Sequence, residues 1–502
     1  MSGGVLGRGL AVWPVVVPLA GAALAALARG RPGLQRAVME AAVALGLVAA
    51  VGLLLRTARG ATVGMAFGGW GAPVGITFVA DVTSALLCAT TGVVALAVAL
   101  YARADVRARR RRAGFDPLFL GMLAAVNGAF LTGDLFNLYV WFELMLVTAL
   151  GLVTLDRRRA QVDGALRYAA LSMMGATFML VGIGLLYGVA GTLDLRDLAA
   201  TLAADPAPSA ARSVAAYLLL AGLALKAGLF PLFFWLPASY HTAPTGVAAA
   251  MAGLLTKVAF YAALRIAVLV FGVGTATAAV PGLAPLFALL AALTMLVSVL
   301  AAIAQTDVRR LLAFHVMGQV GYLVMGLALA SRLGVAAAVF YTVHTMLVQT
   351  GLFLGAGAIA RAGGGYDLRV IGGLARAHPY FSAAFAALAL SISGIPPLSG
   401  FWAKALVLDA AFRTGGAPAA GLALVALVAG FLTLYSMSTL RTQAFWRPPR
   451  RAAAAGARRI PPAMACAVTL LAACTLGLGL AVEPAVRLAR AAAGQLLPGG
   501  AP

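Results

Sequence analysis

Charged side chains are scarce in this sequence. Only 10% of the 502 residues are charged, while 63% are hydrophobic, whereas soluble proteins carry about 25% charged residues. Apolar runs longer than ~18 residues, the length that crosses a bilayer as a helix, recur along the chain. These runs leave no room for a large soluble domain, and they differ from the ~10-residue alternating segments of a strand barrel. We therefore predict an all-α polytopic membrane protein.

Cysteine is also rare, and its placement excludes two kinds of site. Cys88, Cys466 and Cys474 lie in apolar runs without the spacing of a disulfide framework or a metal site. The sequence shows no nucleophile triad and no phosphate-binding motif. We expect neither a cofactor nor a metal, and an intramembrane enzyme is a disfavoured alternative.

The net charge of +22 comes from arginine clusters between apolar runs. Examples are RADVRARRRR at 103–112 and the six arginines between Arg441 and Arg459. Such clusters are typical of cytoplasmic loops under the positive-inside rule, and we do not expect nucleic-acid binding. The arginines at 29–36 follow the first apolar run in the same way, which indicates a retained span and not a signal peptide.

Fourteen membrane spans are predicted from the apolar runs. With the N-terminus outside, the arginine clusters fall in cytoplasmic loops, so we expect both termini outside a bacterial inner (plasma) membrane. The longest outer loop, 56–80, alternates around glycine-rich turns and predicts a small hairpin. The spans are centred near residues 19, 46, 92, 124, 145, 179, 224, 256, 294, 321, 347, 394, 430 and 473.

Lysine is nearly absent, and all three lysines lie in predicted spans. The loops use arginine alone, while Lys226, Lys257 and Lys404 are placed within the apolar runs. A buried ammonium can lose its proton, whereas a guanidinium stays charged. We interpret the lysines as groups that load and unload a proton. The alternative is that lysine, being slimmer, is easier to insert than arginine.

Glu143 is the natural counter-charge for these lysines. It lies nine residues into a span that begins near Asp134, roughly 13 Å deep and close to the middle of the bilayer. Facing Lys226, it would form a pair whose opening lets the lysine release its proton. The alternative is a static buried ion pair that only orders the bundle.

Prolines interrupt two of the predicted spans. LALKAGLFPLFFWLP at 223–237 contains Pro231, and SISGIPPLSGFWAKALVL at 391–408 contains Pro396 and Pro397. Each break lies within two turns of a lysine. Broken helices in corresponding positions of two halves are typical of inverted-repeat transporters, in which unwound backbone lines a cavity.

Further polar residues follow in the intervening spans. His241, His315 and His344 recur there, with Gln349 beyond the last of them. A single histidine in a helix is usually a hydrogen-bonded packing residue. Here the recurrence favours a proton relay, while His378, in a basic loop, is expected at the surface.

Three motifs carry a family resemblance. GDLFNLYVWFELMLVTALGL at 133–152, DVRRLLAFHVMGQVGYLVMG at 307–326 and SGIPPLSGFWAKALVL at 393–408 closely resemble the antiporter-like subunits shared by respiratory complex I and Mrp-type cation/proton antiporters. The resemblance covers roughly residues 80–440. The motif FNLYVWFE and the moderate length of the chain are most similar to those of the D-type subunits of Mrp-type Na⁺/H⁺ antiporters.

The resemblance implies two inverted five-helix repeats, each with one broken helix. It also implies that Glu143, Lys226, Lys257 and Lys404 form a proton-conducting axis in the middle of the membrane. Gln349 departs from the family, which often has a lysine nearby. Either His344 takes over that role or water carries protons there. The implied segments are a three-helix segment with the hairpin (1–112), the repeats (113–272 and 283–442), and a C-terminal helix and tail (460–502).

We therefore expect a proton-conducting subunit of a multisubunit Na⁺/H⁺ antiporter, a secondary transporter and not an enzyme. The expected partners are the A-like, C-like and small subunits of such a complex, with H⁺ and Na⁺ as the ions. One alternative is a proton-pumping membrane subunit, N- or M-like, of NADH-quinone oxidoreductase or of a membrane-bound hydrogenase. Another is a scaffold subunit. The transported cation, the stoichiometry and the subunit that carries the cation are left open.

Overall fold

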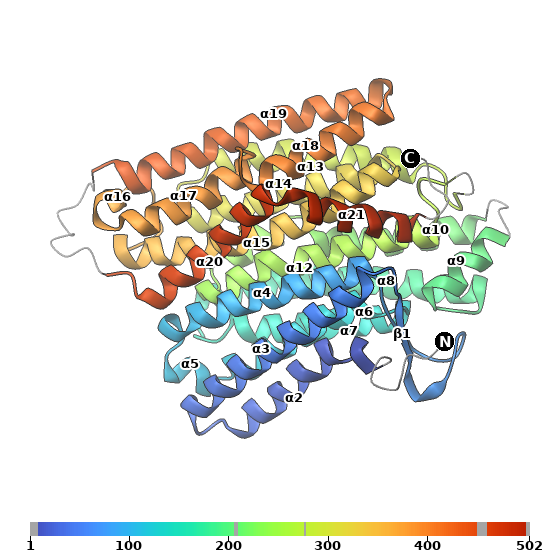
Figure 1. The fold of residues 1–502 in the computed structure, drawn as a ribbon, viewed down its shortest axis with the longest axis horizontal. Coiled ribbons are helices and arrows are strands. Elements are labelled where there is room, and N and C mark those ends of the chain that lie inside the picture. Colours follow the sequence, from blue (N-terminus) through green and yellow to red (C-terminus); the bar gives the residue numbers. More distant parts are fainter. Residues whose placement is uncertain (1–8, 205–208, 276–277, 449–458, 498–502) are drawn as a thin grey trace.

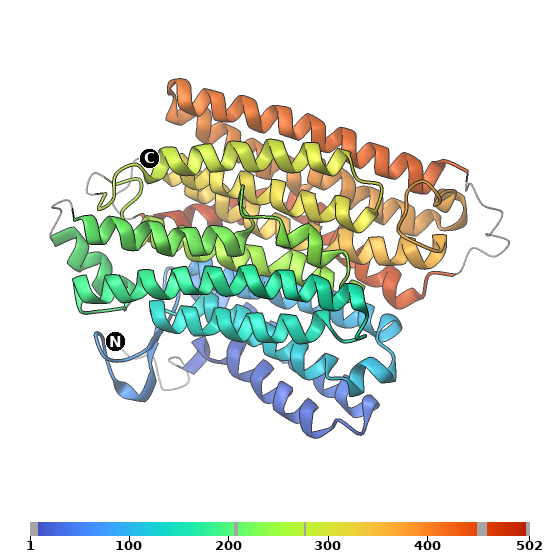
Figure 2. The same ribbon diagram turned by 180° about the vertical axis from the view of Figure 1, so that it is seen from behind.

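Long helices lying side by side make up nearly all of the fold (Figures 1 and 2). The computed structural model describes residues 9–204, 209–275, 278–448 and 459–497. Eleven helices of this described part are long and apolar enough to cross a membrane, and three further apolar helices have 15–17 residues. Thirteen of the fourteen predicted span centres fall on one of these helices, and the remaining one, at residue 394, directly follows the helix Pro379–Ser393. The predicted all-α membrane fold is thereby confirmed.

The helices follow one another with few other elements between them. The main helices are α2 (Trp13–Leu27), α3 (Pro32–Thr57), α4 (Val82–Asp105), α6 (Phe115–Leu131), α7 (Leu135–Val153), α8 (Arg159–Ala190), α10 (Ala210–Ala227), α12 (Thr245–Arg265), α13 (Leu283–Ile303), α14 (Val308–Ala328), α15 (Arg332–Gly363), α17 (Pro379–Ser393), α18 (Ser399–Thr414), α19 (Gly416–Arg441) and α20 (Pro462–Leu480). Shorter helices are α5 (Ala108–Arg112), α9 (Leu195–Ala204), α11 (Trp235–Tyr240), α16 (Leu374–Ala377) and α21 (Val482–Leu496).

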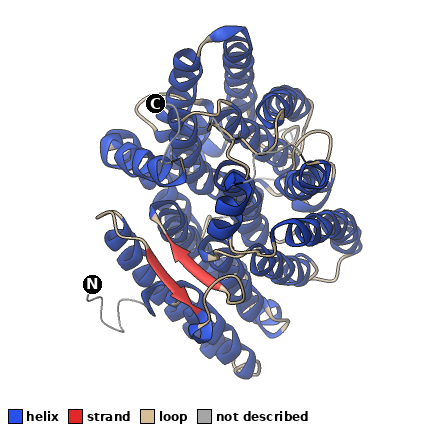
Figure 3. Ribbon diagram, turned by 90° about the vertical axis from the view of Figure 1, so that its right-hand side faces the viewer, coloured by secondary structure: helices blue, strands red, loops and turns tan. Residues whose placement is uncertain are grey.

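The two ends of the bundle differ. At one end, which we call the hairpin end, β1 (Val63–Ala66) pairs antiparallel with β2 (Thr77–Ala80), so the hairpin expected at 56–80 is present (Figure 3). α4 begins at this end and runs to the opposite end, which we call the arginine end. The arginine cluster 103–112 lies there (Figure 1). Part of the second predicted cluster, 449–458, lies outside the described residues.

Burial is uneven across the bundle and matches a lipid environment. The apolar windows of α12, α14 and α15 are 89%, 89% and 94% buried, whereas those of α3 and α19 are 28% and 33% buried. The outer helices therefore keep apolar residues on their exposed faces, as expected for a bundle surrounded by hydrocarbon. The three most buried helices form the centre, and they carry several of the polar residues singled out above.

Glycines set the spacing between α8 and α10. A Cβ added at Gly222 would lie 2.5 Å from the Gly175 carbonyl oxygen, and one added at Gly182 would lie 2.9 Å from the Ala215 carbonyl oxygen. Small residues allow this close approach, which is a main source of helix association in membranes.

Replacing Gly182 by leucine should therefore destabilise the protein, by about 1–3 kcal/mol, because the helices would be forced apart. Gly184 is the matched control, since nothing lies within 4 Å of a Cβ added there. The thermal midpoint of the detergent-purified protein measures the effect. Equal midpoints for Gly182→Leu and Gly184→Leu would show that the α8–α10 contact is not as close as described.

Two segments of the bundle share one order of elements at a fixed spacing. α15 begins 173 residues after α8 begins, and it ends 173 residues after α8 ends. An isolated strand bridge joins Asp134 to Asp194, and another joins Asp307 to Asp367, again 173 residues further on. The first bridge lies at the hairpin end, where the Thr77 hydroxyl donates to Asp194 at 2.8 Å. The second flanks the start of α14 at the arginine end, so the two segments run in opposite directions.

A non-helical break containing proline interrupts one span of each segment. Between α10 and α11 the interruption covers 228–234 and includes Pro231; between α17 and α18 it covers 394–398 and includes Pro396 and Pro397. Gly228 and Gly394 end the first helix of each pair with φ of +77° and +91°, values that favour glycine.

Candidate functional site

The polar residues predicted to form a relay are distributed over six neighbouring elements in the interior. All are buried except Glu143 and Lys404, which are partly buried. They are Glu143 on α7, Lys226 on α10, Lys257 on α12, His315 on α14, His344 and Gln349 on α15, and Lys404 on α18. His241 lies apart from them, in the turn between α11 and α12.

Lys226 lies in the last turn of α10, just before the helix breaks. Its side chain is buried, and its Nζ donates a hydrogen bond to the Ser172 carbonyl oxygen of α8 at 3.3 Å. The same Nζ lies 5.3 Å from the centre of the Phe142 ring, a cation–π distance. A cavity of about 20 Å³ beside it has room for about one water molecule.

Glu143 follows Phe142 directly but does not contact Lys226. Its Oε1 is buried without a hydrogen-bond partner among the described residues. None of the ion pairs of the described chain joins Glu143 to a basic side chain within 4 Å. The sequence analysis expected Glu143 to face Lys226; the structure shows no ion pair between the two side chains. A buried carboxylate oxygen without a hydrogen-bond partner is costly.

Lys257 is fully buried at the centre of the bundle. Its Nζ donates to the Ala252 carbonyl oxygen of its own helix at 2.7 Å. On α15, the Gln349 side-chain amide donates to the His315 carbonyl oxygen at 3.3 Å, while its Oε1 has no partner in the described part of the chain. His315 in turn shares a hydrogen bond with the Ser436 hydroxyl of α19 at 2.9 Å.

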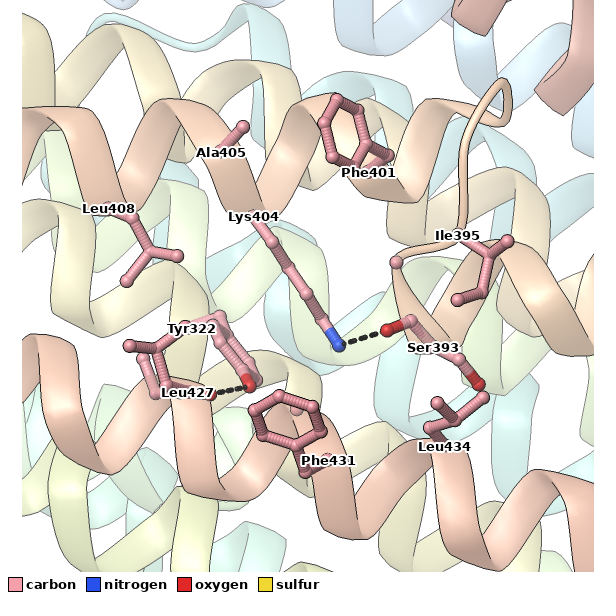
Figure 4. A pocket seen from close by; sticks show the side chains of 13 residues that line it. Tyr322, Ser393, Ile395, Phe401, Lys404, Ala405, Leu408, Leu427, Phe431 and Leu434 are labelled. Atoms are coloured by element: carbon pink, nitrogen blue, oxygen red, sulfur yellow. Dashed lines mark hydrogen bonds between the residues drawn. The ribbon is translucent and has the colours of Figure 1, made fainter.

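Lys404 reaches back across the second helix break. Its Nζ donates a hydrogen bond of 2.9 Å to the carbonyl oxygen of Ser393, and Ser393 is the last residue of α17 (Figure 4). A cavity of about 260 Å³ surrounds the ammonium group, with the Tyr322 ring centre 5.3 Å from Nζ. Leu427 and Phe431, which also line the cavity, are 40% and 72% exposed. The cavity therefore opens toward the outer face of the bundle beside these two side chains.

A row of hydroxyl groups connects His344 to the same break. His344 Nδ1 shares a hydrogen bond with Ser399 Oγ at 2.8 Å, Ser399 Oγ with Thr475 Oγ1 at 2.5 Å, and Thr475 Oγ1 with Ser391 Oγ at 2.6 Å. These four residues come from α15, α18, α20 and α17. Each hydroxyl both donates and accepts, so the row is continuous and able to pass a proton along its hydrogen bonds.

Sequence reasoning missed the three hydroxyl residues of this row. Serine and threonine in an apolar run usually bond to their own helix, and nothing in the spacing of Ser391, Ser399 and Thr475 shows that they meet. The one available signal is the position of Ser391 and Ser399 on either side of the Pro396–Pro397 break.

A second polar cavity, of about 290 Å³, lies at the arginine end and reaches His241. Burial lowers the pKa of His241 below its usual 6.5, and Arg310 and Arg309 act in the same direction. The His241 Nδ1–H donates to the Pro237 carbonyl oxygen at 2.7 Å. The cavity wall also holds Asp105, Arg110 and Asp156. The Arg110 guanidinium forms ion pairs with the carboxylates of both aspartates.

Arg110 holds Asp156 in a bidentate pair, with both nitrogen–oxygen distances 2.7 Å. This hydrogen bonding lowers the pKa of Asp156 below its usual 3.8. A carboxylate whose pKa is lowered by folding adds stability above the unfolded value and loses that contribution as the pH falls through the folded value.

Asp156→Asn should accordingly lower the thermal midpoint at pH 7, by the equivalent of about 1–2 kcal/mol. The difference from the unaltered protein should shrink once the pH falls below about 3.8. Melting curves of the purified protein across this range test it. The control is Asp163→Asn, because the Asp163–Arg167 pair is 62% and 59% exposed and contributes little. A pH-independent difference for Asp156→Asn would contradict the assignment.

Within the described residues, the chain has no group of three or more His, Cys, Asp or Glu side chains placed to hold a metal ion. The arrangement therefore consists of buried ammonium groups, imidazoles, one carboxylate and hydroxyls. These are groups that exchange protons.

Comparison with known proteins gives matches over nearly the whole chain. The family model described as "NADH:quinone oxidoreductase/Mrp antiporter, TM" matches residues 132–433. A Na⁺/H⁺ antiporter D-type subunit of Alkalihalophilus pseudofirmus is 36% identical over 489 residues, 97% of each chain. The Na⁺/H⁺ antiporter D-type subunit of Bacillus subtilis is 34% identical over 437 residues, 87% of this chain and 86% of the relative.

Solved structures agree with these relatives. A chain of the Mrp complex from Dietzia sp. DQ12-45-1b superposes with a TM-score of 0.90 and 32% identity, covering 98% of both chains. A chain of respiratory complex I from Thermus thermophilus with bound NADH superposes with a TM-score of 0.83 and 26% identity, covering 97% of this chain and 99% of the other.

Proposed function

Because the chain belongs to the NADH:quinone oxidoreductase/Mrp antiporter family of membrane subunits, we propose that it conducts protons as a subunit of a multisubunit Na⁺/H⁺ antiporter. The two relatives named above as D-type antiporter subunits, and the higher identity to the Mrp chain than to the complex I chain, support this choice. The function is that of a secondary-transporter subunit. The observation that carries the proposal is the hydrogen bonding of the three lysines.

Each lysine is bonded to a backbone carbonyl and not to a carboxylate. The acceptors of Lys226, Lys257 and Lys404 are three different carbonyl oxygens, and no carboxylate of the described chain lies within 4 Å of any lysine. A lysine in a buried ion pair leaves a bare carboxylate when it loses its proton. A lysine on a carbonyl leaves a neutral amine that still donates to the same oxygen, so unloading is less costly.

Protons would move from the Glu143–Lys226 region to Lys257, then through the histidines to Lys404. The cavities at Lys226 and Lys404 provide space for water between the groups. In this proposal the separation of Glu143 from Lys226 is the open form of the pair, and closure of the pair retains the proton on the lysine. Cation movement is coupled to these steps with the partners, which are A-like, C-like and small subunits.

The membrane orientation follows from the two ends. The arginine end would face the cytoplasm under the positive-inside rule, which puts the hairpin end and the N-terminus outside a bacterial inner membrane. The constant spacing and opposite direction of the two segments support two inverted repeats of five helices, 113–272 and 283–442. His241 and its cavity would then face the cytoplasmic side.

Loss of either member of the Glu143–Lys226 region should abolish transport. Glu143→Ala and Lys226→Ala are each expected to remove the sodium tolerance that the complex confers on an antiporter-deficient host, with assembly unchanged. Glu40→Ala is the matched control, because Glu40 pairs with the exposed Arg103. Growth of either test variant at the level of the unaltered protein would overturn the role.

Lys404→Arg separates proton release from charge. Arginine keeps the positive charge but does not release its proton, so a conducting role requires Lys404→Arg to fail as fully as Lys404→Ala. The measurement is the Na⁺-driven pH gradient in proteoliposomes that contain the purified complex. A normal gradient with Lys404→Arg would show that only the charge matters, and a normal gradient with Lys404→Ala would favour a scaffold role. The identity of the proteins that copurify with the chain distinguishes this proposal from the complex I-like and hydrogenase alternatives.

A further inference from the structure

The last helix of the described chain, α21, carries charge on the outside of a membrane-embedded bundle. Glu483, Arg487 and Arg490 recur at helical spacing, and all three are exposed. We call them the polar stripe. The opposite face, which includes Val486, Ala489, Ala493 and Leu496, is buried against α15 and α4. From the sequence alone, this region was expected to be a tail.

α21 runs along the bundle and not across its end (Figure 1). At its C-terminus, Gln495 Oε1 accepts a hydrogen bond from the backbone N–H of Val82, the first residue of α4, at 3.0 Å. Arg332, the first residue of α15, donates to the Leu497 carbonyl oxygen at 3.0 Å. These bonds tie the end of α21 to the hairpin end of the bundle.

The beginning of α21 consequently lies deep in the membrane. Glu483 precedes Gln495 by twelve residues, or ~18 Å of helix. An apolar cavity gives a second measure: Pro484 and Ala485 line it together with Phe340 and Val343 of α15, which lie ~12–16 Å along α15 from Arg332. Since the hydrocarbon core is ~30 Å thick, both measures put Glu483 near the middle of the bilayer.

Contact between the polar stripe and lipid would be energetically unfavourable. A charged residue near the bilayer centre costs roughly 2.5–3.5 kcal/mol even on insertion scales. Arginines extend toward the headgroups along their apolar stems, but a glutamate side chain is too short to do so from this depth. Glu483 pairs with Arg487 at 2.9 Å, yet these side chains remain 59% and 73% exposed. The stripe therefore requires a protein surface.

We propose that the polar stripe is the docking surface for a membrane helix of another subunit, one that carries a carboxylate opposite Arg490. Glu483 neutralises Arg487, whereas Arg490 has no carboxylate within 4 Å among the described residues, so the stripe has an excess of one positive charge. Ala491 and Gly494 are exposed on the same side, and small residues permit close approach of a second helix. This proposal goes beyond proton conduction, because it concerns assembly alone.

A second copy of the chain fits this surface less well. Identical chains in one membrane orientation are related by a two-fold axis along the bilayer normal, which brings equal residues to equal depth. The two Arg490 side chains would then meet without a carboxylate between them.

Site-specific photo-crosslinking in the purified complex tests the proposal. A p-benzoylphenylalanine at position 487, in place of Arg487, is expected to give one adduct that contains this chain and one other subunit, identified by mass. An adduct with lipid alone, or with a second copy of the chain, would overturn the proposal. A signal at this position requires only that the complex assembles, and transport is not measured.

Charge reversal at Arg490 gives the independent test. Arg490→Glu should reduce the amount of the crosslinked subunit that copurifies with the chain by about tenfold, the effect of about 1.4 kcal/mol. Arg490→Lys, which keeps the charge, should leave the composition unchanged. Amounts are normalised to the chain itself, so poor accumulation of a variant does not mimic dissociation. Full copurification with both Arg490→Glu and the triple variant Glu483→Leu/Arg487→Leu/Arg490→Leu would refute the proposal.

Discussion

The hydrogen bond between a buried ammonium group and a backbone carbonyl is the interaction on which this bundle depends. A regular helix uses its carbonyls internally, so a lysine among apolar helices finds few acceptors. The break after α17 supplies one, because Ser393 lies at a helix end and its carbonyl is free for Lys404. The negative end of the α17 dipole favours the cation at the same place. The break is thus a binding feature for the charge as well as an interruption of the helix.

The two halves solve this problem differently. Lys226 also lies beside a break, but its acceptor is Ser172, in the middle of the unbroken helix α8. The Leu225 carbonyl beside the first break instead accepts from the indole N–H of Trp235 at 3.0 Å and from the backbone N–H of Gly228 at 3.2 Å. The bond to Ser172 is also longer than the bond to Ser393, 3.3 Å against 2.9 Å. The Lys226 ammonium is therefore held less closely by its carbonyl than Lys404 is, which suits the exchange of partners with Glu143 that we propose.

Prediction from sequence succeeded for features that depend on a single property of the sequence, namely the positions of the spans and of the helix breaks. Apolar length determines the spans, and proline with glycine determines where α10 and α17 end. It failed for contacts, because depth along a helix says little about direction around its axis. Glu143 was expected to face Lys226 yet forms no ion pair with it, and the hydroxyls of Ser399 and Thr475 meet across two helices with no sequence signal. α21 was missed because its charges, at helical spacing, resemble those of a soluble tail.

One member of the hydroxyl row, Thr475, lies in the same continuous stretch of chain as the polar stripe. Thr475 of α20 lies between Ser391 and Ser399 in the row, and four residues later the Gly479 carbonyl accepts from the Trp402 indole at 2.9 Å. α21 begins at Val482, immediately beyond. Any protein bound to α21 consequently holds the helix whose side chain bridges the two halves of the second break. Because a hydrogen bond weakens steeply with distance and angle, a small shift of α20 would interrupt the row between Ser399 and Ser391. The proposed docking at α21 would in this way be linked directly to the proposed proton path.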